Sequence, residues 1–470
     1  MMAPIKFGTD GWRGVIAEDF TFANVQKVAL ATARYFRNHK KIKNGIVIGY
    51  DARFLSKEFA HTAAQVIASA GLKVKLADKI ASTPMTSLGI VKMNAAGGVV
   101  ITASHNPAKY NGFKIKGDFG GPAHPEMVAK VEEQLAPILK AKELSLKVKP
   151  FDDLVKKKLV EFVDLTSLYV EDIKTKIEFD LIKVVGIKIM YDAMYGAGQG
   201  VPEMLLPNVG TVRSSFNPSF GGGHPEPLAQ NLEELAVEVR EGGYDIGIAT
   251  DGDADRVGAI DEKGNFVDSH RIFAILLKYL VERKLYKGEV AKSLSVSEII
   301  PKMCAKYGLT LHETPVGFKY LCRLMTERDI IIAGEESGGI GVKGHLPERD
   351  GILVGFLLAE IMAVRRMKLS ELVQELFDEY GEFHFGRIDA HVTEQEKKKI
   401  VGYYSKKPKK IGAFDVERVD TTDGFKFFID GGWILVRASG TEPLIRFYAE
   451  AHSPDKVESM LKAAKKINAR

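Results

Sequence analysis

VVITASHNPAKYNGFKIKG, residues 99–117, is the stretch of sequence that decides how the first part of the chain folds. The apolar run GVVI at 98–101 has the length and composition of a buried strand. The polar segment TASHNP at 102–107 follows it, and its final proline prevents the strand from continuing. The short segment NGFKIK at 111–116 then leads back. We therefore expect a strand, a tight polar loop and a returning segment.

The polar loop carries side chains that can do chemistry. Ser104 and His105 lie in the loop itself, and the returning segment brings Lys114 towards them. In open α/β sheets, ligands usually bind beyond the carboxyl ends of the strands, which is where this loop lies. A loop serine also commonly serves as a turn or helix cap, and one loop by itself does not separate the two interpretations.

Helix and strand patterns alternate around this stretch. Such alternation is typical of a parallel, three-layer α/β unit. The expected helices lie at about 24–38 and 56–70, and the expected strands at 45–50 and 73–77.

Two further loops repeat the construction of the first. YDIGIATDGDADR at 244–256 is an apolar strand that runs into three aspartates, and DIIIAGEESGG at 329–339 is one that runs into an acidic, glycine-rich turn. We interpret the three stretches as copies of one structural repeat. A strand at 184–191 is expected to open the second unit, and a helix at 269–284 the third.

The chain has a different pattern after about residue 372. Strand-like alternation at 382–392, 424–428 and 433–436, followed by a helix from 454, predicts a smaller α+β domain. The fold class is therefore α/β, with three similar three-layer α/β/α domains and a C-terminal α+β domain. We place the four domains at 1–150, 151–257, 258–371 and 372–470.

Composition limits the kinds of partner. The 66 Lys and Arg residues exceed the 61 Asp and Glu residues by only five, and without a basic stripe nucleic acid is not an expected partner. No apolar stretch approaches the roughly 20 residues that span a bilayer, and the N-terminus lacks a signal-peptide core. We expect no membrane partner and a cytoplasmic location. Two cysteines, Cys304 and Cys322, are too few for a disulfide framework or a cysteine-based metal site.

Asp251, Asp253 and Asp255 alternate along an extended segment, so their carboxylates fall on one side of it. Like charges this close repel one another unless a cation is bound, and hard oxygen ligands select Mg²⁺ or Ca²⁺. The spacing is also that of an EF-hand, but Arg256 stands where that loop needs glycine, and a strand precedes it. The triad predicts a Mg²⁺ site that keeps positions for water or a phosphoryl oxygen.

Two other loops suit a phosphorylated sugar. RASGTEP at 437–443 combines a guanidinium, two hydroxyls and a glycine, and Arg446 follows it, a combination that suits a phosphate group. Glu335 and Ser337 offer an acceptor and a hydroxyl for neighbouring sugar hydroxyls.

Together the loops outline a phosphoryl transfer. Ser104 would carry the phosphoryl group, and Mg²⁺ on the aspartates would neutralise charge on the transferring oxygens. His105 and Lys114 would move the hydroxyl proton. Arg437 would hold a second phosphate that does not react, and so would fix the distance between the two ends of the substrate.

These loops resemble the motifs of the α-D-phosphohexomutase family, which includes phosphoglucomutase and phosphomannomutase. The resemblance covers essentially the whole chain. TASHNP at 102–107 resembles the family's phosphoserine loop, and DGDADR at 251–256 resembles its magnesium loop. GEESGG at 334–339 is similar to its sugar loop, and RASGTEP at 437–443 to its phosphate-binding loop.

The resemblance implies four domains around a central cleft and a resting enzyme phosphorylated on Ser104. The serine oxygen would complete the Mg²⁺ shell formed by the three aspartates. Phosphate would pass to a hexose 1-phosphate, and the hexose 1,6-bisphosphate would turn over in the site. The other phosphate would then return to the serine and leave the hexose 6-phosphate. A trace of hexose 1,6-bisphosphate would act as the activator.

The resemblance also implies roles for individual residues. Around the phosphoserine it places Arg13, His105, Lys114 and Arg256. For the sugar it implies Glu335 and Ser337, together with Gly317 and Lys319 of the specificity loop TPVGFK at 314–319. For the distal phosphate it implies Arg437, Ser439, Gly440 and Thr441.

Gly339 departs from the family pattern. Many bacterial phosphomannomutases, and the glucosamine enzymes, have histidine at this position, and we expect the nearby His345 to cover that role in binding the sugar. The segments at 313–319 and 345–351 look more like those of glucose enzymes. We therefore expect glucose phosphates as substrates, with mannose phosphates also possible. The alternatives are a phosphoglucosamine mutase, a phosphatase and a non-catalytic sugar-phosphate binding protein. The sequence leaves the oligomeric state open.

Overall fold

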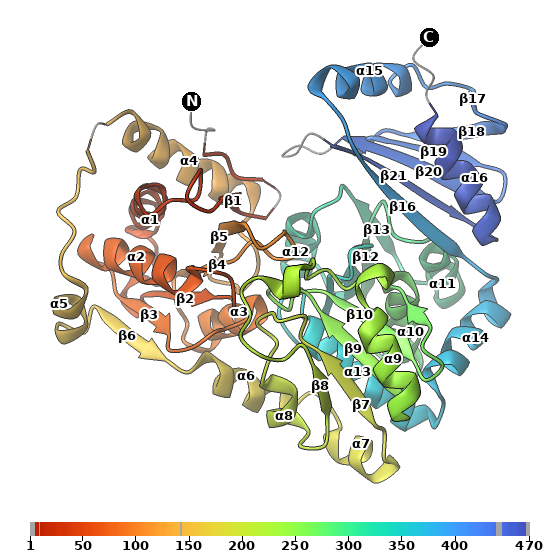
Figure 1. The fold of residues 1–470 in the computed structure, drawn as a ribbon, viewed down its shortest axis with the longest axis horizontal. Coiled ribbons are helices and arrows are strands. Elements are labelled where there is room, and N and C mark those ends of the chain that lie inside the picture. Colours follow the sequence, from red (N-terminus) through yellow and green to blue (C-terminus); the bar gives the residue numbers. More distant parts are fainter. Residues whose placement is uncertain (1–4, 9, 142, 439–443, 467–470) are drawn as a thin grey trace.

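The computed structural model of the chain describes residues 5–8, 10–141, 143–438 and 444–466. Within these residues the strands form four sheets, and with their helices they make up four α/β domains. Figure 1 shows the first and fourth domains at opposite ends of the molecule, with the second and third between them. Among the described helices, none combines the length and apolar character needed to cross a bilayer.

The first sheet has the strand order β1-β5-β4-β2-β3-β6. It is mixed, whereas a parallel sheet was expected, because the loop after β4 is so tight that β5 returns antiparallel beside it. The crossovers β2–α2–β3 and β3–α3–β4 run in opposite directions, so right-handed connections put α2 and α3 on opposite faces. The strands are β1 (Trp12–Val15), β2 (Ile46–Tyr50), β3 (Val74–Ala77), β4 (Gly97–Ile101), β5 (Tyr110–Lys116) and β6 (Val160–Val163).

Two of the helices of the first domain, α1 and α2, lie where helices were expected, and α3, α4 and α5 were not predicted. Thr21 caps α1 by accepting the backbone N–H of Asn24, and Ser82 caps α3 by accepting that of Met85. The helices are α1 (Phe22–Phe36), α2 (Ser56–Ser69), α3 (Thr83–Lys92), α4 (Pro125–Lys140) and α5 (Phe151–Lys156). Because β6 adds to this sheet after α5, the expected boundary at residue 150 falls within the first domain.

The second sheet has the order β11-β10-β9-β7-β8. The strand expected at 184–191 is wrong in its first half, because α7 continues to Val185 and ends where Gly186 adopts a φ of 81°. The expected boundary at 257 falls at the start of β10. The elements are α6 (Leu165–Lys174), α7 (Phe179–Val185), β7 (Ile189–Asp192), α8 (Val201–Leu205), β8 (Gly210–Val212), α9 (Glu233–Gly242), β9 (Ile246–Thr250), β10 (Val257–Asp261) and β11 (Phe266–Val267).

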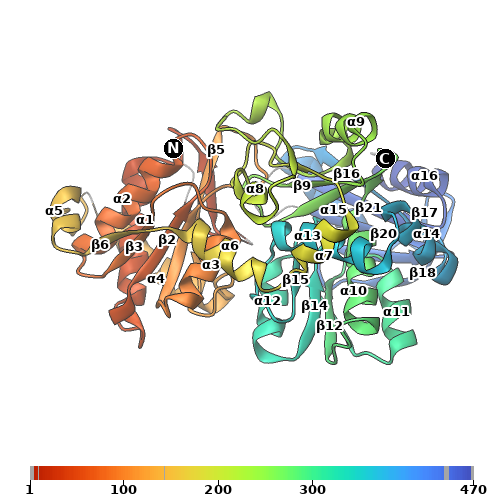
Figure 2. The ribbon, with the colours of Figure 1, turned by 90° about the horizontal axis from the view of Figure 1, so that it is seen from below.

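The third sheet has the order β13-β12-β14-β15, with β15 antiparallel to β14. The helix that follows it, α13, packs on β9 and β10 of the second sheet and on α10 of its own domain (Figure 2). The elements are α10 (Ser269–Glu282), β12 (Glu289–Ser293), α11 (Ile299–Tyr307), β13 (Leu311–Thr314), α12 (Phe318–Glu327), β14 (Ile330–Gly334), β15 (Ile340–Val342), α13 (Gly351–Arg365) and α14 (Leu369–Tyr380). The expected boundary at 371 falls inside α14.

The fourth sheet is antiparallel, with the order β16-β21-β20-β19-β18-β17. Its core, which includes Phe427, Ile434 and Phe447, is separate from the large core of the first three domains. The elements are β16 (His384–His391), α15 (Glu394–Tyr404), β17 (Lys410–Ile411), β18 (Phe414–Asp420), β19 (Phe425–Ile429), β20 (Gly432–Ala438), β21 (Leu444–Ala451) and α16 (Pro454–Lys465).

Candidate active site

Ser104 is buried in the loop after β4, and its side chain points at an acidic cluster. The backbone has a positive φ of 52°, an uncommon conformation for a residue with a side chain. The Ser104 N–H donates to Thr102 Oγ1 at 2.8 Å. The hydroxyl donates to Asp251 Oδ2 at 2.7 Å, and His105 Nδ1 lies 3.4 Å from the same oxygen of Ser104. The turn therefore directs the serine of the first domain at the aspartate loop of the second.

The loop around Ser104 is held by Arg53, a residue that sequence reasoning missed. Arg53 is buried beyond the end of β2, where its Nε lies 3.1 Å from Asp51. A guanidinium presents five N–H donors in a fixed fork, so one side chain can hold several carbonyls. The signal in the sequence is an Asp-x-Arg at the end of an expected strand. Arg53 donates to the carbonyls of Ser104, Asn106, Pro107 and Tyr110.

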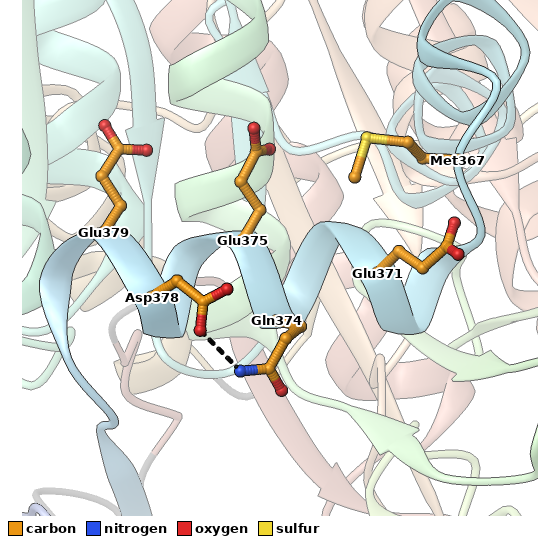
Figure 3. A pocket seen from close by; sticks show the side chains of 6 residues that line it. All are labelled: Met367, Glu371, Gln374, Glu375, Asp378 and Glu379. Atoms are coloured by element: carbon orange, nitrogen blue, oxygen red, sulfur yellow. Dashed lines mark hydrogen bonds between the residues drawn. The ribbon is translucent and has the colours of Figure 1, made fainter.

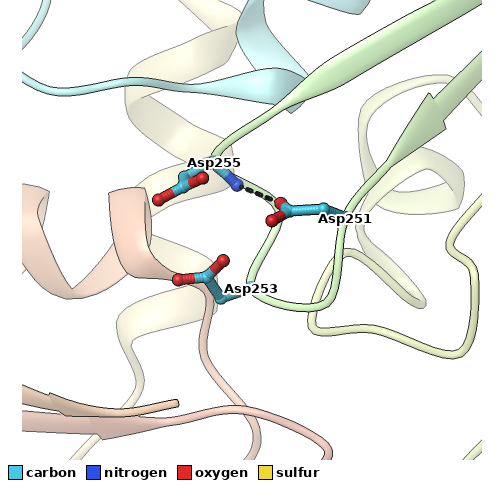
Figure 4. A group of neighbouring side chains, drawn as sticks. All are labelled: Asp251, Asp253 and Asp255. Carbon is cyan, nitrogen blue, oxygen red and sulfur yellow. Dashed lines mark hydrogen bonds between the residues drawn. The ribbon is translucent and has the colours of Figure 1, made fainter. Parts of the chain in front are cut away.

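Asp251, Asp253 and Asp255 meet in the loop between β9 and β10 (Figure 4), as the sequence predicts. All three are fully buried, and each offers an oxygen within 4.8 Å of the others. Asp251 Oδ1 accepts the backbone N–H of Asp255 at 3.0 Å. Asp253 Oδ2 accepts from Thr83 Oγ1 at 2.5 Å and from Lys114 Nζ at 2.8 Å. Each carboxylate is thus fixed through at least one of its oxygens.

The remaining carboxylate oxygens fit a hard divalent cation. The Oδ1 atoms of Asp253 and Asp255 are buried and have no hydrogen-bond partner among the residues that the structure describes. A buried, unpaired carboxylate oxygen is costly unless a cation lies against it. Mg²⁺ prefers such oxygens and keeps waters on its other positions. The triad could therefore hold a divalent metal ion such as Mg²⁺.

The three carboxylates perturb one another. Burial, and then the charges of Asp253 and Asp255, raise the pKa of Asp251 well above its ordinary value. Burial also acts to raise the pKa of Asp253, but the Lys114 ammonium outweighs it and holds that pKa below its usual range. The opposite directions show how strongly the cluster depends on nearby positive charge.

Lys114 on β5 brings its ammonium group into this cluster. Its Nζ lies 2.8 Å from both Asp10 and Asp253 and 3.2 Å from Asp255. Burial alone would lower the pKa of Lys114, but the three carboxylates raise it above its ordinary value. Lys114 therefore remains a cation at neutral pH, and its partners are these carboxylates, not Ser104 or His105.

A second buried cation, Arg349, was not foreseen. Its Nη2 lies 2.5 Å from Asp10 and 2.7 Å from Asp255, and its Nη1 lies 3.6 Å from Glu335. It therefore joins carboxylates of the first, second and third domains. A Cβ atom at Gly339 would overlap Arg349 Cδ, so the arginine fills the space beside this glycine.

Two further predicted residues, Arg13 and Arg256, lie near the serine loop, and a third, His105, is part of it. Arg13 Nη1 donates to Asn106 Oδ1 in this loop. Arg256 Nη1 lies 3.5 Å from Glu226, and its Nε lies 4.0 Å from Asp251. Burial, and then the charges of Arg256 and Arg13, lower the pKa of His105 well below its usual range, so the imidazole is neutral at pH 7.

The expected sugar loop lies at the end of β14, against the metal loop. The Val257 N–H donates to the Gly338 carbonyl at 3.1 Å. Glu335 is buried, and its Oε1 accepts the Gly317 N–H at 2.9 Å. Burial raises the pKa of Glu335 to about 7, although Arg349 opposes this. Ser337 is half-buried in the same loop.

Lys319 lies at the start of α12 and lines a cavity of about 190 Å³ together with Asp10 and Gly11. Burial lowers the pKa of Lys319. Its Nζ lies 5.3 Å from the centre of the Tyr320 ring. This cavity borders the acidic cluster through Asp10.

His345 does not take the place that we expected for it. Its Nε2 lies 2.9 Å from Asp350 and its Nδ1 3.8 Å from Asp172, and its side chain is only 2% exposed. Asp350 in turn accepts from the Tyr169 hydroxyl and caps α13. His345 is thus held in a buried network at the start of α13, and Arg349 is the side chain beside Gly339 and Glu335.

Arg437 at the end of β20 is held by Asp423, whose Oδ2 accepts its Nε–H at 2.8 Å. Burial acts to lower the pKa of Arg437, but Asp423 raises it. Ser439, Gly440 and Thr441, which we expect to bind the distal phosphate, lie outside the described residues.

A larger cavity, of about 430 Å³, lies elsewhere, along α14 (Figure 3). Its lining is acidic, but Glu375 pairs with Arg365 at 2.9 Å and Glu379 pairs with Lys278 at 2.7 Å. None of the predicted site residues lines this cavity. Size alone is therefore a poor guide to the functional site in this chain.

Comparison with known proteins finds matches in all four domains of the chain. Four sequence models match it. They are described as phosphoglucomutase/phosphomannomutase alpha/beta/alpha domain I at residues 4–142, domain II at 167–264, domain III at 268–380 and the C-terminal domain at 391–466.

Individual relatives agree in length and fold. A phosphoglucomutase/phosphomannomutase of Thermococcus kodakarensis is 32% identical over 466 residues, 98% of each chain. A phosphoglucosamine mutase of Carboxydothermus hydrogenoformans is 32% identical over 94% of each chain. A crystal structure of a protein from Thermus thermophilus is 33% identical over 99% of each chain, with a TM-score of 0.86. The open form of Paramecium phosphoglucomutase, 23% identical over 98% of this chain and 95% of its own, has a TM-score of 0.81.

Proposed function

Because the chain belongs to the phosphoglucomutase/phosphomannomutase family of phosphohexomutases, we propose that it interconverts hexose 1-phosphate and hexose 6-phosphate, with glucose favoured and mannose also accepted. The observation that carries this proposal is the hydrogen bond from the Ser104 hydroxyl to Asp251, 2.7 Å long, within a buried triad of carboxylates. A nucleophilic oxygen beside a Mg²⁺ site is what phosphoryl transfer requires.

The reaction has two phosphoryl transfers. In the first, phosphorylated Ser104 gives its phosphoryl group to the free 6-hydroxyl of hexose 1-phosphate, whose proton goes to a nearby base, and the hexose 1,6-bisphosphate forms. The sugar turns over, the 1-phosphoryl group passes back to the serine oxygen, and the base returns its proton to the sugar O1. The product is hexose 6-phosphate, and a trace of the bisphosphate primes unphosphorylated enzyme.

This chain's residues would have the following roles. Asp251, Asp253, Asp255 and the Ser104 oxygen would hold Mg²⁺, which supplies charge neutralisation at the transferring oxygens. His105, neutral at pH 7, would accept the hydroxyl proton as the general base. The cations that would surround the transferred phosphoryl group are Arg13, Lys114 and Arg256.

The substrate would be gripped at two further points. Glu335 and Ser337 would hold two adjacent sugar hydroxyls in either orientation, with Gly317 and Lys319 beside them. Arg437, with Ser439, Gly440 and Thr441, would hold the phosphate that does not react. A fixed phosphate at one end leaves the other end of the sugar at the serine in both steps.

Glucose is favoured over glucosamine on electrostatic grounds. The charged side chain beside Glu335 is a cation, Arg349, which offers no partner to a 2-ammonium group. A loop that only lines space beside carbon 2 discriminates between glucose and mannose by about 10- to 200-fold. The second candidate is a phosphoglucosamine mutase, because a relative that matches 94% of this chain carries that name.

One set of assays tests the proposal. With Mg²⁺ and a trace of glucose 1,6-bisphosphate, kcat/KM should rank glucose 1-phosphate first, mannose 1-phosphate second and glucosamine 1-phosphate last. Intact-mass analysis should find phosphate on Ser104, and Ser104→Ala should lower turnover by several orders of magnitude. Glucosamine 1-phosphate as the best substrate would replace the first candidate by the second. Release of inorganic phosphate without isomerisation would identify a phosphatase, and binding without turnover a sugar-phosphate binding protein.

A further inference from the structure

Asp423 is a half-buried carboxylate between β18 and β19 that contacts two domains at once. Its Oδ2 accepts the Nε–H of Arg437, in its own domain, at 2.8 Å. The same oxygen accepts the backbone N–H of Val316, in the third domain, at 3.0 Å. One carboxylate oxygen therefore joins the arginine proposed to hold phosphate to the loop between β13 and α12.

The hairpin of β19 and β20 places Asp423 beside Arg437. Phe425 pairs with Val436 across the two strands, so Gly424 comes opposite Arg437. Gly424 has a φ of 84°, and a Cβ atom here would lie 2.5 Å from the Val436 carbonyl oxygen. Glycine thus lets the turn close against β20, which brings the neighbouring carboxylate onto the guanidinium.

The loop that Asp423 touches also binds the sugar-loop carboxylate. The Gly317 N–H, next along the chain from that of Val316, donates to Glu335 Oε1 at 2.9 Å. Two successive backbone N–H groups therefore hold two carboxylates, one from each domain. The Val316 side chain packs against an apolar cluster formed by both domains: Leu294, Trp433, Leu435 and Tyr448.

We propose that Asp423 is a positioning residue, which orients Arg437 towards the non-reacting phosphate and ties it to the loop that holds Glu335. This inference rests on the proposed function. A carboxylate on the Nε edge fixes the plane of a guanidinium, so less freedom is lost when the arginine binds phosphate. The link through Val316 and Gly317 fixes the distance from this arginine to the sugar-binding carboxylate. A hexose phosphate has a set span, so a fixed distance favours its binding.

Asp423→Asn is the variant that tests this role. Its amide oxygen can still accept from Val316 and from Arg437, but the negative charge that strengthens the bond to the guanidinium is gone. We expect KM for glucose 1-phosphate to rise about tenfold, with kcat changed by less than about threefold, because uniform binding of substrate and transition state is lost. Asp423→Ala, which removes both hydrogen bonds, should raise KM further. Asp415→Asn is the matched control, because Asp415 is an exposed carboxylate of the same domain that pairs with Lys410; its KM should equal that of the wild type.

A double-mutant cycle shows whether Asp423 acts through Arg437. If it does, Asp423→Asn should have almost no further effect on KM in an Arg437→Ala background. The same cycle is run by calorimetry with glucose 6-phosphate on the unphosphorylated protein, which needs no turnover. Thermal melts of all variants check that each is folded.

The outcomes separate the inference from the proposed function. An unchanged KM in Asp423→Asn, or the same tenfold rise in the Arg437→Ala background, overturns the role given to Asp423. A wild-type chain that binds glucose 6-phosphate without isomerising glucose 1-phosphate overturns the mutase, and the calorimetric cycle then decides on Asp423 alone. If Arg437→Ala binds glucose 6-phosphate with wild-type affinity, Arg437 does not hold the phosphate, and Asp423 has no role in orienting it.

Discussion

Glu335 is a residue of the site whose charge changes near neutral pH. Burial raises its pKa from 4.5 to about 7. The unfolded chain therefore ionises this carboxyl more easily than the folded chain does. Its contribution to stability is complete below about pH 4.5 and is lost as the pH rises through 7. The shift, about 2.5 units, corresponds to about 3 kcal/mol.

Glu335→Gln should remove this pH dependence, because the amide stays neutral. We expect the free energy of unfolding of the variant, relative to wild type, to rise by up to about 3 kcal/mol between pH 5 and pH 8. Urea denaturation at the two pH values measures it. Glu238→Gln, at an exposed carboxylate on α9, should leave the pH dependence as in wild type. Parallel curves for Glu335→Gln and wild type would contradict the raised pKa.

Residues that act within one continuous motif could be predicted from the sequence, and those that act across long distances in sequence could not. The aspartates at 251, 253 and 255 share a loop, so their spacing alone brings them together. Arg53 binds carbonyls 51 to 57 residues away, and Arg349 binds Asp10 across 339 residues. Only the fold brings those partners together. The role expected for His345 was wrong for the same reason. Its partner Asp172 is distant in sequence, and the local pattern does not show that Asp350 faces it.

At the scale of elements, the loop between β4 and β5 depends on a side chain that belongs to neither strand. Arg53 donates to three carbonyls of this loop and to one at the start of β5, and so sets the direction of Ser104. Lysine keeps the charge but lacks the planar fork, so it cannot hold several carbonyls at once. A displaced loop would misalign the serine with the aspartates, and a shift of about 1 Å costs on the order of 100-fold in rate.

Arg53→Lys should therefore lower kcat by about 10- to 100-fold, while circular dichroism shows a folded protein. Arg37→Lys is the matched control, since Arg37 is an exposed arginine of the same domain that donates to the Ala70 carbonyl. Its kcat should be that of the wild type. Wild-type turnover in Arg53→Lys would mean that the backbone holds the loop without the guanidinium.

The pattern of elements was largely predictable, because apolar runs and capping residues are local. Which strands pair within each sheet was less predictable. β5 and β15 return antiparallel after tight loops, and β6 joins the first sheet after a long lysine-rich segment. Val184 and Val185 were assigned to a strand from their composition, but Gly186 ends a helix there. Local patterns give the element type, and the partner of each strand depends on contacts across the chain.

At the scale of the whole molecule, a buried ion pair docks the first domain on the third. Lys116 on β5 and Glu348 before α13 are both fully buried, 2.5 Å apart. An exposed pair, Arg323 with Glu126, joins the same two domains. Removal of one partner from a buried pair leaves an uncompensated charge and costs about 3–5 kcal/mol, whereas an exposed pair contributes about 0–1 kcal/mol.

Glu348→Gln should thus destabilise the protein by about 3–5 kcal/mol, and Glu126→Gln by less than about 1 kcal/mol. Chemical denaturation measures the free energy of unfolding of both variants and so compares two ion pairs at one interface. The double variant Lys116→Met, Glu348→Gln should recover most of the lost stability, because no buried charge then remains unpaired. Equal effects of Glu348→Gln and Glu126→Gln would mean that water reaches the buried pair.

The position of α13 bears on how the chain is made. This helix follows the third sheet in sequence but covers β9 and β10 of the second, and Gly351 to Ala363 are all buried. A ribosome adds about 5–20 residues per second, so the 104 residues from Asp261 to Arg365 take roughly 5–20 seconds to emerge. During that interval, the apolar face of the second sheet that α13 later covers is exposed. The second domain is therefore completed only after most of the third has been synthesised, and the nascent chain passes through a stage at which a chaperone would find an exposed sheet.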